Sequence, residues 1–410
     1  MKTIQTQADL DSLQSRALSL VVPKEAVLAV GLGTCGIGNG AQDIYDAIAE
    51  KLSRLGEGAP RLKKTGCFGF CAEEPMVSLY RPGKSVLLFG SARKADVTSY
   101  IRAAQDQKAA DKLASFAYAR IDDWDFMNGN YSFGSSYPKT PVWNETSFFK
   151  GQTKLVLRDA GLIDPESLDE YIAVGGYAAL CKVLTTMDSR AVVEELSASG
   201  LRGRGGAGFP TGRKWELMRI QEGAEKWVIC NADEGDPGAY MNRNEIESDP
   251  HMIIEGMAIG AYAMGARQGF IYIRAEYPLA VQRLNHAIEE ARERGFLGEH
   301  IFGTDFSFDL EIVQGAGAFV CGEETALIAS AEGRAGRSSS VPLPSPVWFP
   351  WRPYHHQQCG NLVQHPLDTF AWSRSFQGYW DRAIPGNQGL FLGGQGAQYR
   401  PSGAAPGHTP

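Results

Sequence analysis

The chain has 410 residues, and its 47 Asp and Glu outnumber its 40 Lys and Arg, which gives a formal net charge of -7. This length predicts two or three domains, and the acidic balance argues against binding to nucleic acid or to anionic membranes. The N-terminus lacks a basic segment followed by an apolar run, so we expect no secretory signal, and no apolar run approaches the roughly 20 residues of a membrane span. The cysteines are too sparse for a disulfide scaffold. We therefore expect a cytoplasmic protein that partner subunits could hold at a membrane.

The first third of the chain is predicted to contain a small α/β domain. Residues 1–23 are expected to form a helical segment, and residues 24–110 the domain itself. Strand-like apolar runs occur at 26–30, 76–80 and 85–89, and a helical pattern at 41–55. Residues 111–150 are rich in Asn, Ser, Tyr and Pro and are predicted to be a linker that packs on a surface.

Residues 151–337 are predicted to form a second domain, in which strands alternate with helices. The expected strands are 227–230, 270–273 and 308–313, and the expected helices are 251–266 and 278–294. Strands joined by long crossovers predict a parallel sheet, and ligands bind such sheets beyond the carboxyl ends of the strands. The predicted fold class is therefore α/β, with a Rossmann-like parallel-sheet domain following the N-terminal domain.

A glycine-rich loop between Gly200 and Trp215 packs six glycines and four basic side chains into sixteen positions. Glycines let the backbone approach a ligand and point N–H groups toward it, while Arg and Lys neutralise phosphate. Lys214 is not followed by Ser or Thr, and no strand directly precedes the loop, which excludes the two commonest nucleotide-binding motifs. The pattern predicts a flavin or dinucleotide phosphate as the ligand, with a tight surface turn as the alternative.

Two acidic loops follow predicted strands of the second domain. Their candidate binding residues are Asn231, Asp233, Glu234 and Asp236 in the first loop, and Gly322, Glu323 and Glu324 in the second. Carboxylates and amides at the ends of strands can hydrogen-bond ribityl or ribose hydroxyls and ring nitrogens. A solvated acidic turn in the first loop and ordinary acids at a helix start in the second are the alternatives.

Together these three segments resemble the flavin-bearing NADH-oxidising subunit of respiratory complex I and its relatives in NAD(P)-linked hydrogenases and formate dehydrogenases, over about residues 148–337. The resemblance implies FMN in the glycine loop and NADH stacked over the flavin. It implies hydride transfer from nicotinamide to flavin, electron release to iron–sulfur clusters, and no dedicated acid–base catalytic residue. The implied partners are NAD(P)H and the iron–sulfur and catalytic subunits of a multisubunit oxidoreductase.

The resemblance also implies which residues contact each cofactor. Those implied to hold FMN are Gly203, Arg204, Gly205, Gly206, Ala207, Gly208, Lys214, Asn231, Asp233 and Gly322. Those implied to lie near NADH are Phe209, Asp236, Phe319, Glu323 and Glu324, and Glu234 belongs to the same cofactor-binding set. Relatives often carry Glu where Asp236 stands and Tyr where Phe319 stands.

Three cysteines in Gly-rich loops of the N-terminal domain, Cys35, Cys67 and Cys71, suit thiolate ligation of an iron–sulfur cluster. The arrangement resembles the thioredoxin-like ferredoxin domain that some of these relatives carry. A [2Fe–2S] cluster needs four ligands, and Val30 or Gly31 stands where a partner of Cys35 would lie. Either a non-cysteine ligand completes the site, or the domain folds without metal. The remaining cysteines predicted as core residues are Cys181, Cys230 and Cys321.

The tail, residues 338–410, has neither helical period nor strand pattern. The resemblance implies a Pro-Thr-Ile-Ile-Asn-Asn-Val-Glu-Thr type segment that touches the flavin and a later cysteine cluster for [4Fe–4S], and both are absent. Codons for residues 353–361 can encode that segment when they are read one nucleotide out of register. A single-base frameshift near residues 334–340 is therefore our hypothesis, with a genuine low-complexity extension as the alternative.

The sequence predicts an FMN-dependent NAD(P)H dehydrogenase subunit that passes electrons to iron–sulfur clusters of a larger complex. Because the tail lacks these elements, the first alternative is a truncated or non-catalytic nucleotide-binding or interaction subunit. A regulatory module that binds NADH without flavin is a third hypothesis.

Overall fold

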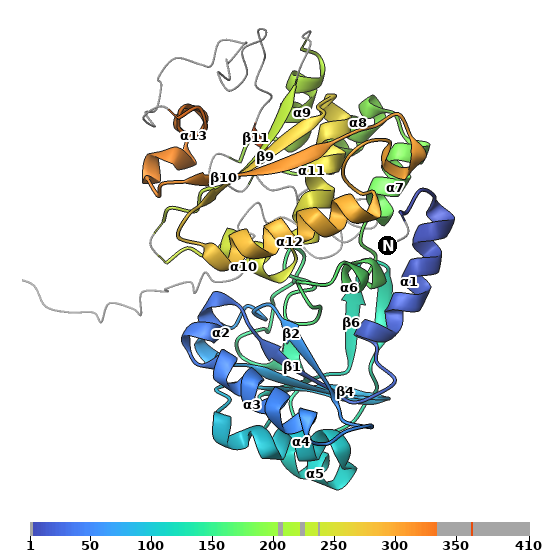
Figure 1. The fold of residues 1–410 in the computed structure, drawn as a ribbon, viewed down its shortest axis with the longest axis vertical. Helices are drawn as coiled ribbons and strands as arrows, with labels where there is room; N and C mark the ends of the chain where they lie inside the picture. The colour runs from blue at the N-terminus through green and yellow to red at the C-terminus, as the bar shows by residue number, and fades with distance from the viewer. Residues whose placement is uncertain (1–2, 204–207, 222–225, 237, 334–361, 364–410) are drawn as a thin grey trace, which may run out of the picture.

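Two sheet-bearing domains are stacked along the long axis of the molecule (Figure 1). The structure is a computed structural model, and it describes residues 3–203, 208–221, 226–236, 238–333 and 362–363. Helix α1 (Gln7–Val21) lies beside both domains and packs against α6 (Leu168–Ala173). The Thr6 side chain caps α1 by accepting a hydrogen bond from the amide of Asp9, which accounts for the predicted N-terminal helical segment.

The N-terminal domain has a five-stranded sheet of order β2-β1-β3-β4-β5. The strands are β1 (Val27–Gly31), β2 (Arg61–Thr65), β3 (Val77–Arg81), β4 (Lys84–Phe89) and β5 (Ala119–Ile121), and the helices are α2 (Thr34–Gly38), α3 (Ala41–Ser53), α4 (Val97–Gln105) and α5 (Gln107–Leu113). Strands β1 and β2 are parallel, and the other pairs are antiparallel. The three predicted strands and the predicted helix are confirmed. The thioredoxin-like assignment of this domain stays a prediction.

Side chains of β1 alternate between two apolar cores, as the period of a strand requires. Leu28 and Val30 join the core under α3 and α4, whereas Val27 and Ala29 join the larger core that continues into the second domain. Strand β2 was not predicted because its sequence is highly charged. Its Lys63 is buried, and the ammonium lies 2.8 Å from a carboxylate oxygen of Glu170 in α6.

The predicted linker, residues 111–150, contains strands of its own. It holds β5 and a hairpin formed by β6 (Asp123–Phe126) and β7 (Gly129–Ser132). Its aromatic rings pack on the loop that follows β2: the ring centroids of Phe70 and Phe148 are 3.9 Å apart and stacked, and those of Phe68 and Trp124 are 5.7 Å apart. The linker thus holds the loop that contains Phe68 and Phe70 in place.

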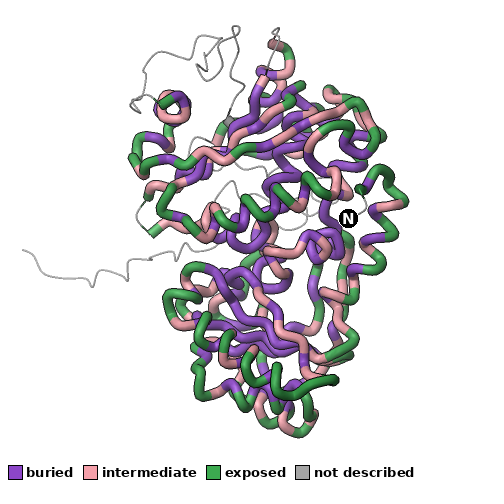
Figure 2. The backbone as a smooth tube through the Cα atoms, viewed as in Figure 1, coloured by how far each residue is buried: buried purple, intermediate pink, exposed green. Residues whose placement is uncertain are grey.

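The second domain is built on a parallel sheet of order β10-β9-β8-β11. Its elements are β8 (Trp227–Ala232), β9 (Gln268–Arg274), β10 (Asp309–Gly315), β11 (Leu362–Val363), α7 (Ala178–Thr186), α8 (Ser189–Ala198), α9 (Thr211–Arg219), α10 (Met241–Ser248), α11 (Pro250–Met264), α12 (Pro278–Arg294) and α13 (Glu324–Ala331). The predicted strands, helices and parallel sheet of this domain are confirmed. Figure 2 shows that the central strands of both sheets are largely buried, whereas the edge strand β10 is mostly half-buried or exposed.

Helices α11 and α12 begin and end where the local sequence dictates. Each starts with Pro at its first turn, and each ends at a glycine with positive φ, Gly265 (φ 79) and Gly295 (φ 82). Helix α11 is nearly all buried, and the side chain of Asp249 caps its start by accepting from the amide of Met252 at 3.2 Å. Short 3-10 turns occur at Cys71–Glu73, Lys94–Asp96, Ala114–Phe116, Trp143–Glu145, Ile301–Gly303 and Phe319–Gly322.

The hypothesis about the tail falls almost wholly outside the described residues. Of residues 338–410 only Leu362 and Val363 are described, and their backbone pairs in parallel with Ile229 and Cys230 of β8. Within the described part of the chain, no helix combines the length and the apolar character that crossing a bilayer requires.

Candidate functional site

The glycine loop is closed at its base by backbone hydrogen bonds. The amide of Gly203 donates to the carbonyl of Phe209 at 2.9 Å, and the guanidinium of Arg202 donates to the carbonyl of Gly208 at 3.2 Å. The amide of Thr211 donates to Leu201 at 2.9 Å, so the second arm of the loop runs directly into α9. The predicted residues Arg204, Gly205, Gly206 and Ala207 lie outside the described residues.

Lys214 connects the glycine loop to the second acidic loop. It lies in the first turn of α9, its side chain is 19% exposed, and its Nζ is 3.9 Å from an Oε atom of Glu324. Burial lowers the pKa of Lys214, and the nearby Glu324 carboxylate opposes that shift. The structure therefore brings a cation and the start of a helix to one place, as an anionic ligand requires.

Asn231 joins the two acidic loops. Its side-chain amide donates to the carbonyl of Gly322 at 2.9 Å, and its Oδ1 accepts from the amide of Asp233 at 3.1 Å. A Cβ atom at Gly322 would lie 3.5 Å from the carbonyl oxygen of Asp233. These contacts bring three of the predicted residues together at the carboxyl end of β8.

Asp233 is a buried acid that meets no donor among the residues that the structure describes. Its relative exposure is 8%, and neither carboxylate oxygen accepts a hydrogen bond there. Burial raises its pKa to about 6, against an opposing effect of Arg274. Leaving a buried polar group unsatisfied costs about 1–3 kcal/mol, so this carboxylate suits a ligand that supplies hydroxyl donors. The residues present thus fit the ribityl chain of FMN.

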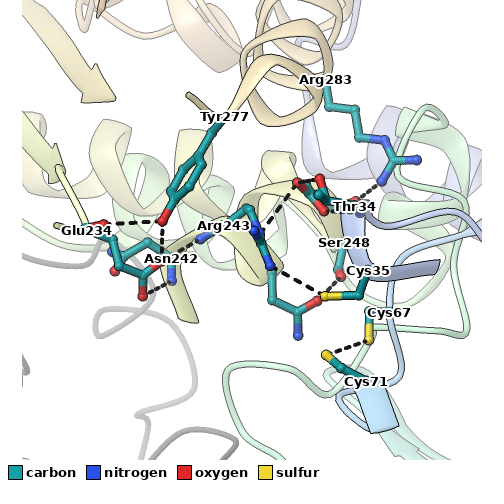
Figure 3. Close-up of polar contacts among 12 residues, drawn as sticks. Thr34, Cys35, Cys67, Cys71, Glu234, Asn242, Arg243, Ser248, Tyr277 and Arg283 are labelled. Atoms are coloured by element: carbon teal, nitrogen blue, oxygen red, sulfur yellow. Dashed lines mark hydrogen bonds and ion pairs between the residues drawn. The ribbon is translucent and has the colours of Figure 1, made fainter. Parts of the chain in front are cut away.

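Glu234 has a structural partner that the sequence did not indicate. Its Oε1 accepts hydrogen bonds from the amides of Met241 at 2.6 Å and Asn242 at 3.1 Å, at the start of α10. The hydroxyl of Tyr277 donates to the carbonyl of Glu234 at 3.2 Å (Figure 3). The structure therefore places the predicted cofactor-binding carboxylate on a helix terminus, where it orients the first acidic loop.

Two aromatic rings are exposed on the loops of the site. Phe209 is 47% exposed and Phe319 is 67% exposed, although large apolar side chains are usually covered. A Cβ atom at Gly235 would lie 2.9 Å from Cδ2 of Phe319, so the ring rests against a position that needs glycine. Asp236 is also exposed, and the Glu323 carboxylate accepts from the amide of Ala326 at 3.2 Å.

Sequence reasoning missed Arg274 and Thr211. The Arg274 guanidinium donates to the carbonyl of Glu234 at 2.6 Å and to Glu276 at 2.8 Å. Its place at the carboxyl end of β9 was the signal that could have identified it. Thr211 opens α9, and its buried hydroxyl has no partner among the described residues. No pattern in the sequence distinguishes that hydroxyl from an ordinary helix-start residue.

The three predicted metal ligands lie together at the contact between the domains (Figure 3). The Sγ atoms of Cys67 and Cys71 are 3.6 Å apart, and the guanidinium of Arg243 in α10 donates to Sγ of Cys35 at 3.4 Å. The Cys35 thiol lowers the pKa of Cys71, but the Cys67 thiol and burial outweigh it and raise that pKa to about 12.

These thiols do not fit a [2Fe–2S] cluster. In the described part of the chain, no three or more His, Cys, Asp or Glu side chains are arranged to hold a metal ion. The sequence has Val30 and Gly31 at the end of β1, so no fourth thiol lies there, and the buried Glu74 carboxyl is 3.2 Å from where a Gly31 Cβ would be. That carboxyl accepts from the amide of Met76 at 2.8 Å, and burial raises its pKa to about 7.

The three cysteines predicted as core residues are buried. Cys181 packs in the large core, Cys230 lies in β8, and Cys321 joins a small core with Ile229 and Tyr272.

Comparison with known proteins finds similarity over much of the second domain. Residues 196–349 match the family model described as the Nuo51 FMN-binding domain. The NADP-reducing hydrogenase subunit HndC of Solidesulfovibrio fructosivorans is 56% identical over 197 residues, which are 48% of this chain and 40% of that relative. An NADH-quinone oxidoreductase subunit of Aquifex aeolicus is 46% identical over 213 residues, which are 52% of this chain and 48% of that relative.

An NADH-quinone oxidoreductase subunit of Rhizobium meliloti is 42% identical over 242 residues, which are 59% of this chain and 58% of that relative. The chain thus spans about half the length of the curated relatives it matches. A crystal structure of an NAD+-reducing [NiFe]-hydrogenase in the air-oxidized state has a TM-score of 0.42 and 23% identity, and the match covers 89% of this chain and 57% of that one. The relatives confirm the resemblance that the sequence motifs predict.

Proposed function

We propose that this chain, which contains a Nuo51 FMN-binding domain at residues 196–349, binds FMN and NAD(H) and acts as the NAD(P)H-oxidising subunit of a larger oxidoreductase. When bound, FMN supplies the chemistry: it accepts a hydride from the nicotinamide and releases the electrons singly. The protein binds and orients the two cofactors, so the proposal assigns no acid–base catalytic residue.

The buried carboxylate of Asp233 is the observation that carries this proposal. It faces no donor among the described residues, and Asn231 fixes its backbone beside Gly322. The absence of a side chain at Gly322 leaves room for a ligand beside this carboxylate. Ribityl hydroxyls would satisfy the Asp233 oxygens and remove the cost of their burial.

The glycine loop and Lys214 are assigned to the flavin phosphate. The loop is closed at its base and leads into the first turn of α9, where the N–H groups of a helix start favour an anion. The Lys214 ammonium neutralises the phosphate charge from the same turn. Gly203 and Gly208 belong to this contact, and Arg204, Gly205, Gly206 and Ala207 are assigned to it from the sequence.

The exposed rings of Phe209 and Phe319 are assigned to the planar rings of NADH. Aromatic faces bind planar ring systems by offset stacking, and both side chains expose enough surface to do so. Asp236, Glu323 and Glu324 are assigned to ribose hydroxyls, with Glu234 holding the loop in place through the α10 terminus. The partners proposed are iron–sulfur and catalytic subunits, because the relatives are named as subunits of a quinone oxidoreductase and a hydrogenase.

The test uses the full chain reconstituted with FMN under anaerobic conditions. We expect flavin fluorescence to be quenched on binding and flavin absorbance to bleach when NADH is added. Asp233→Asn should weaken FMN binding about tenfold or more, because one hydrogen bond to a charged group contributes about 1.5–3 kcal/mol. Asp305→Asn changes an exposed aspartate and should leave FMN affinity unchanged.

The two alternative functions give different results in the same experiment. A non-catalytic nucleotide-binding subunit would bind FMN or NADH without bleaching of the flavin. A regulatory module would bind NADH and leave FMN fluorescence unquenched. Either result would refute the proposed activity.

A further inference from the structure

We propose that Cys67 and Cys71 form a reversible disulfide at the contact between the domains, in place of the iron–sulfur cluster that their spacing suggests. The Sγ atoms are 3.6 Å apart, and a disulfide bond is about 2.05 Å long, so small side-chain rotations can join them. The inference concerns the N-terminal domain and does not depend on the proposed function of the second domain.

The loop between the two cysteines holds their sulfurs close. Phe68 and Phe70 anchor it in the aromatic cluster of the linker, so the backbone on both sides of Gly69 is fixed. Gly69 has φ +91, and its amide donates to Sγ of Cys67 at 3.3 Å. The turn that brings the sulfurs together therefore depends on a glycine.

Two basic side chains, Arg243 and Lys154, lie beside the thiols. Arg243 donates a hydrogen bond to Sγ of Cys35 at 3.4 Å. On the other side Lys154 lies 3.5 Å from the centroid of the Phe68 ring and donates to the Phe68 carbonyl. Cys35 also interacts with Cys71, but the sulfur–sulfur contact on which the disulfide rests is the one of 3.6 Å between Cys67 and Cys71.

The difference in exposure between the two cysteines gives the order of reaction with a small disulfide such as glutathione disulfide. Cys71 is half-buried, whereas Cys67 is 2% exposed. Cys71 loses its proton, and the resulting thiolate attacks the small disulfide, forms a mixed disulfide and releases one thiolate, which takes up that proton. Cys67 then attacks the Cys71 sulfur and releases the second thiol. Two cysteine thiols are oxidised, the small disulfide is reduced to two thiols, and the two cysteine protons end on those thiols.

The experiment maps the disulfide in the full chain. Protein purified anaerobically is equilibrated in glutathione buffers of increasing oxidised fraction, alkylated under denaturing conditions and digested for mass spectrometry. We expect a Cys67–Cys71 disulfide that thiols reduce, and iron, zinc and sulfide contents far below stoichiometric. Stoichiometric metal, a disulfide from Cys35 to Cys71, or free thiols throughout the oxidised buffers would each overturn the proposal.

Three serine variants separate the disulfide from a cluster. Cys35→Ser should keep the Cys67–Cys71 disulfide, whereas a cluster would lose a ligand. Cys67→Ser should leave Cys71 trapped as a mixed disulfide with glutathione. In Cys71→Ser the buried Cys67 should stay unmodified in the folded protein, and its modification at the same rate as Cys71 would contradict the proposed order. Circular dichroism identifies any variant that fails to fold, and disulfide mapping of the wild type does not depend on the variants.

Discussion

Arg243 and Cys35 are 208 positions apart in the sequence, and the guanidinium of the first donates to the sulfur of the second at 3.4 Å. The same helix, α10, contributes Glu247, whose Oε2 accepts from the backbone amide of Thr34 at 2.7 Å. At its other end α10 is capped by Glu234 of the first acidic loop. One short helix therefore contacts both the thiol site and the first acidic loop of the candidate cofactor site (Figure 3).

Arg283 should be essential for the contact between the domains. It is 2% exposed, donates to the carbonyl of Leu32 at 2.9 Å and also donates to the carbonyl of Glu247. Arg283→Ala removes both donors from buried carbonyls, so we expect a loss of about 3–5 kcal/mol in the free energy of unfolding. Chemical denaturation followed by circular dichroism measures it.

Arg190→Ala is the matched control, because Arg190 also lies on a helix but its ion pair with Glu194 is 72% and 62% exposed. Its expected cost is below about 1 kcal/mol. Equal losses in the two variants would mean that the buried contacts of Arg283 do not stabilise the fold.

Removing one partner of the buried Lys63–Glu170 ion pair should destabilise the protein more than replacing both partners by apolar residues. The two groups are 3% and 4% exposed and 2.8 Å apart, so each is the main compensation for the other. Glu170→Gln alone should cost about 3–5 kcal/mol because it leaves a buried ammonium uncompensated. The double variant Lys63→Met with Glu170→Leu should recover most of that loss, since apolar replacement of a buried pair is often neutral. A double variant no more stable than the single one would contradict this.

The Lys63–Glu170 pair also illustrates which features the sequence predicts and which depend on tertiary contacts. The apolar runs of β1, β3, β8 and β9 predict strands by themselves, and the composition of residues 200–215 indicates the glycine loop. Strand β2 contains two lysines, and it is compatible with burial only because Glu170 comes from an element about a hundred positions away. The cap that Glu234 gives to α10 and the contact of Arg243 with Cys35 also depend on tertiary structure.

Asp233 should reduce the stability of the cofactor-free protein at neutral pH. Burial raises its pKa from 3.8 to about 6, so the folded state favours the protonated acid. The stability that protonation of Asp233 gives to the folded state is fully present below about pH 4, and it is lost as the pH rises through about 6 and the folded state has to ionise this acid. Asp233→Asn should therefore stabilise the cofactor-free protein by about 1–3 kcal/mol at pH 7.5, and by little at pH 4.

FMN should reverse that effect. In wild type, FMN should raise the melting temperature at pH 7.5, and in Asp233→Asn the increase should be smaller because the charged acceptor is gone. A cofactor-free variant that is less stable than wild type at pH 7.5 would show that Asp233 already has favourable partners without FMN.

Phe319 should contribute to NADH binding and little to stability. Its ring is 67% exposed, so Phe319→Ala removes little buried apolar area from the fold. Loss of one aromatic stacking contact corresponds to about 0.5–1.5 kcal/mol, which predicts a KM for NADH raised about two- to tenfold, with little change in FMN affinity. Phe319→Tyr retains the ring and should keep the KM near that of wild type.

Phe116→Ala is the matched control, because Phe116 is 74% exposed in the N-terminal domain and should leave the KM unchanged. Equal effects of the Phe319→Ala and Phe116→Ala substitutions on the KM would remove Phe319 from the proposed NADH site.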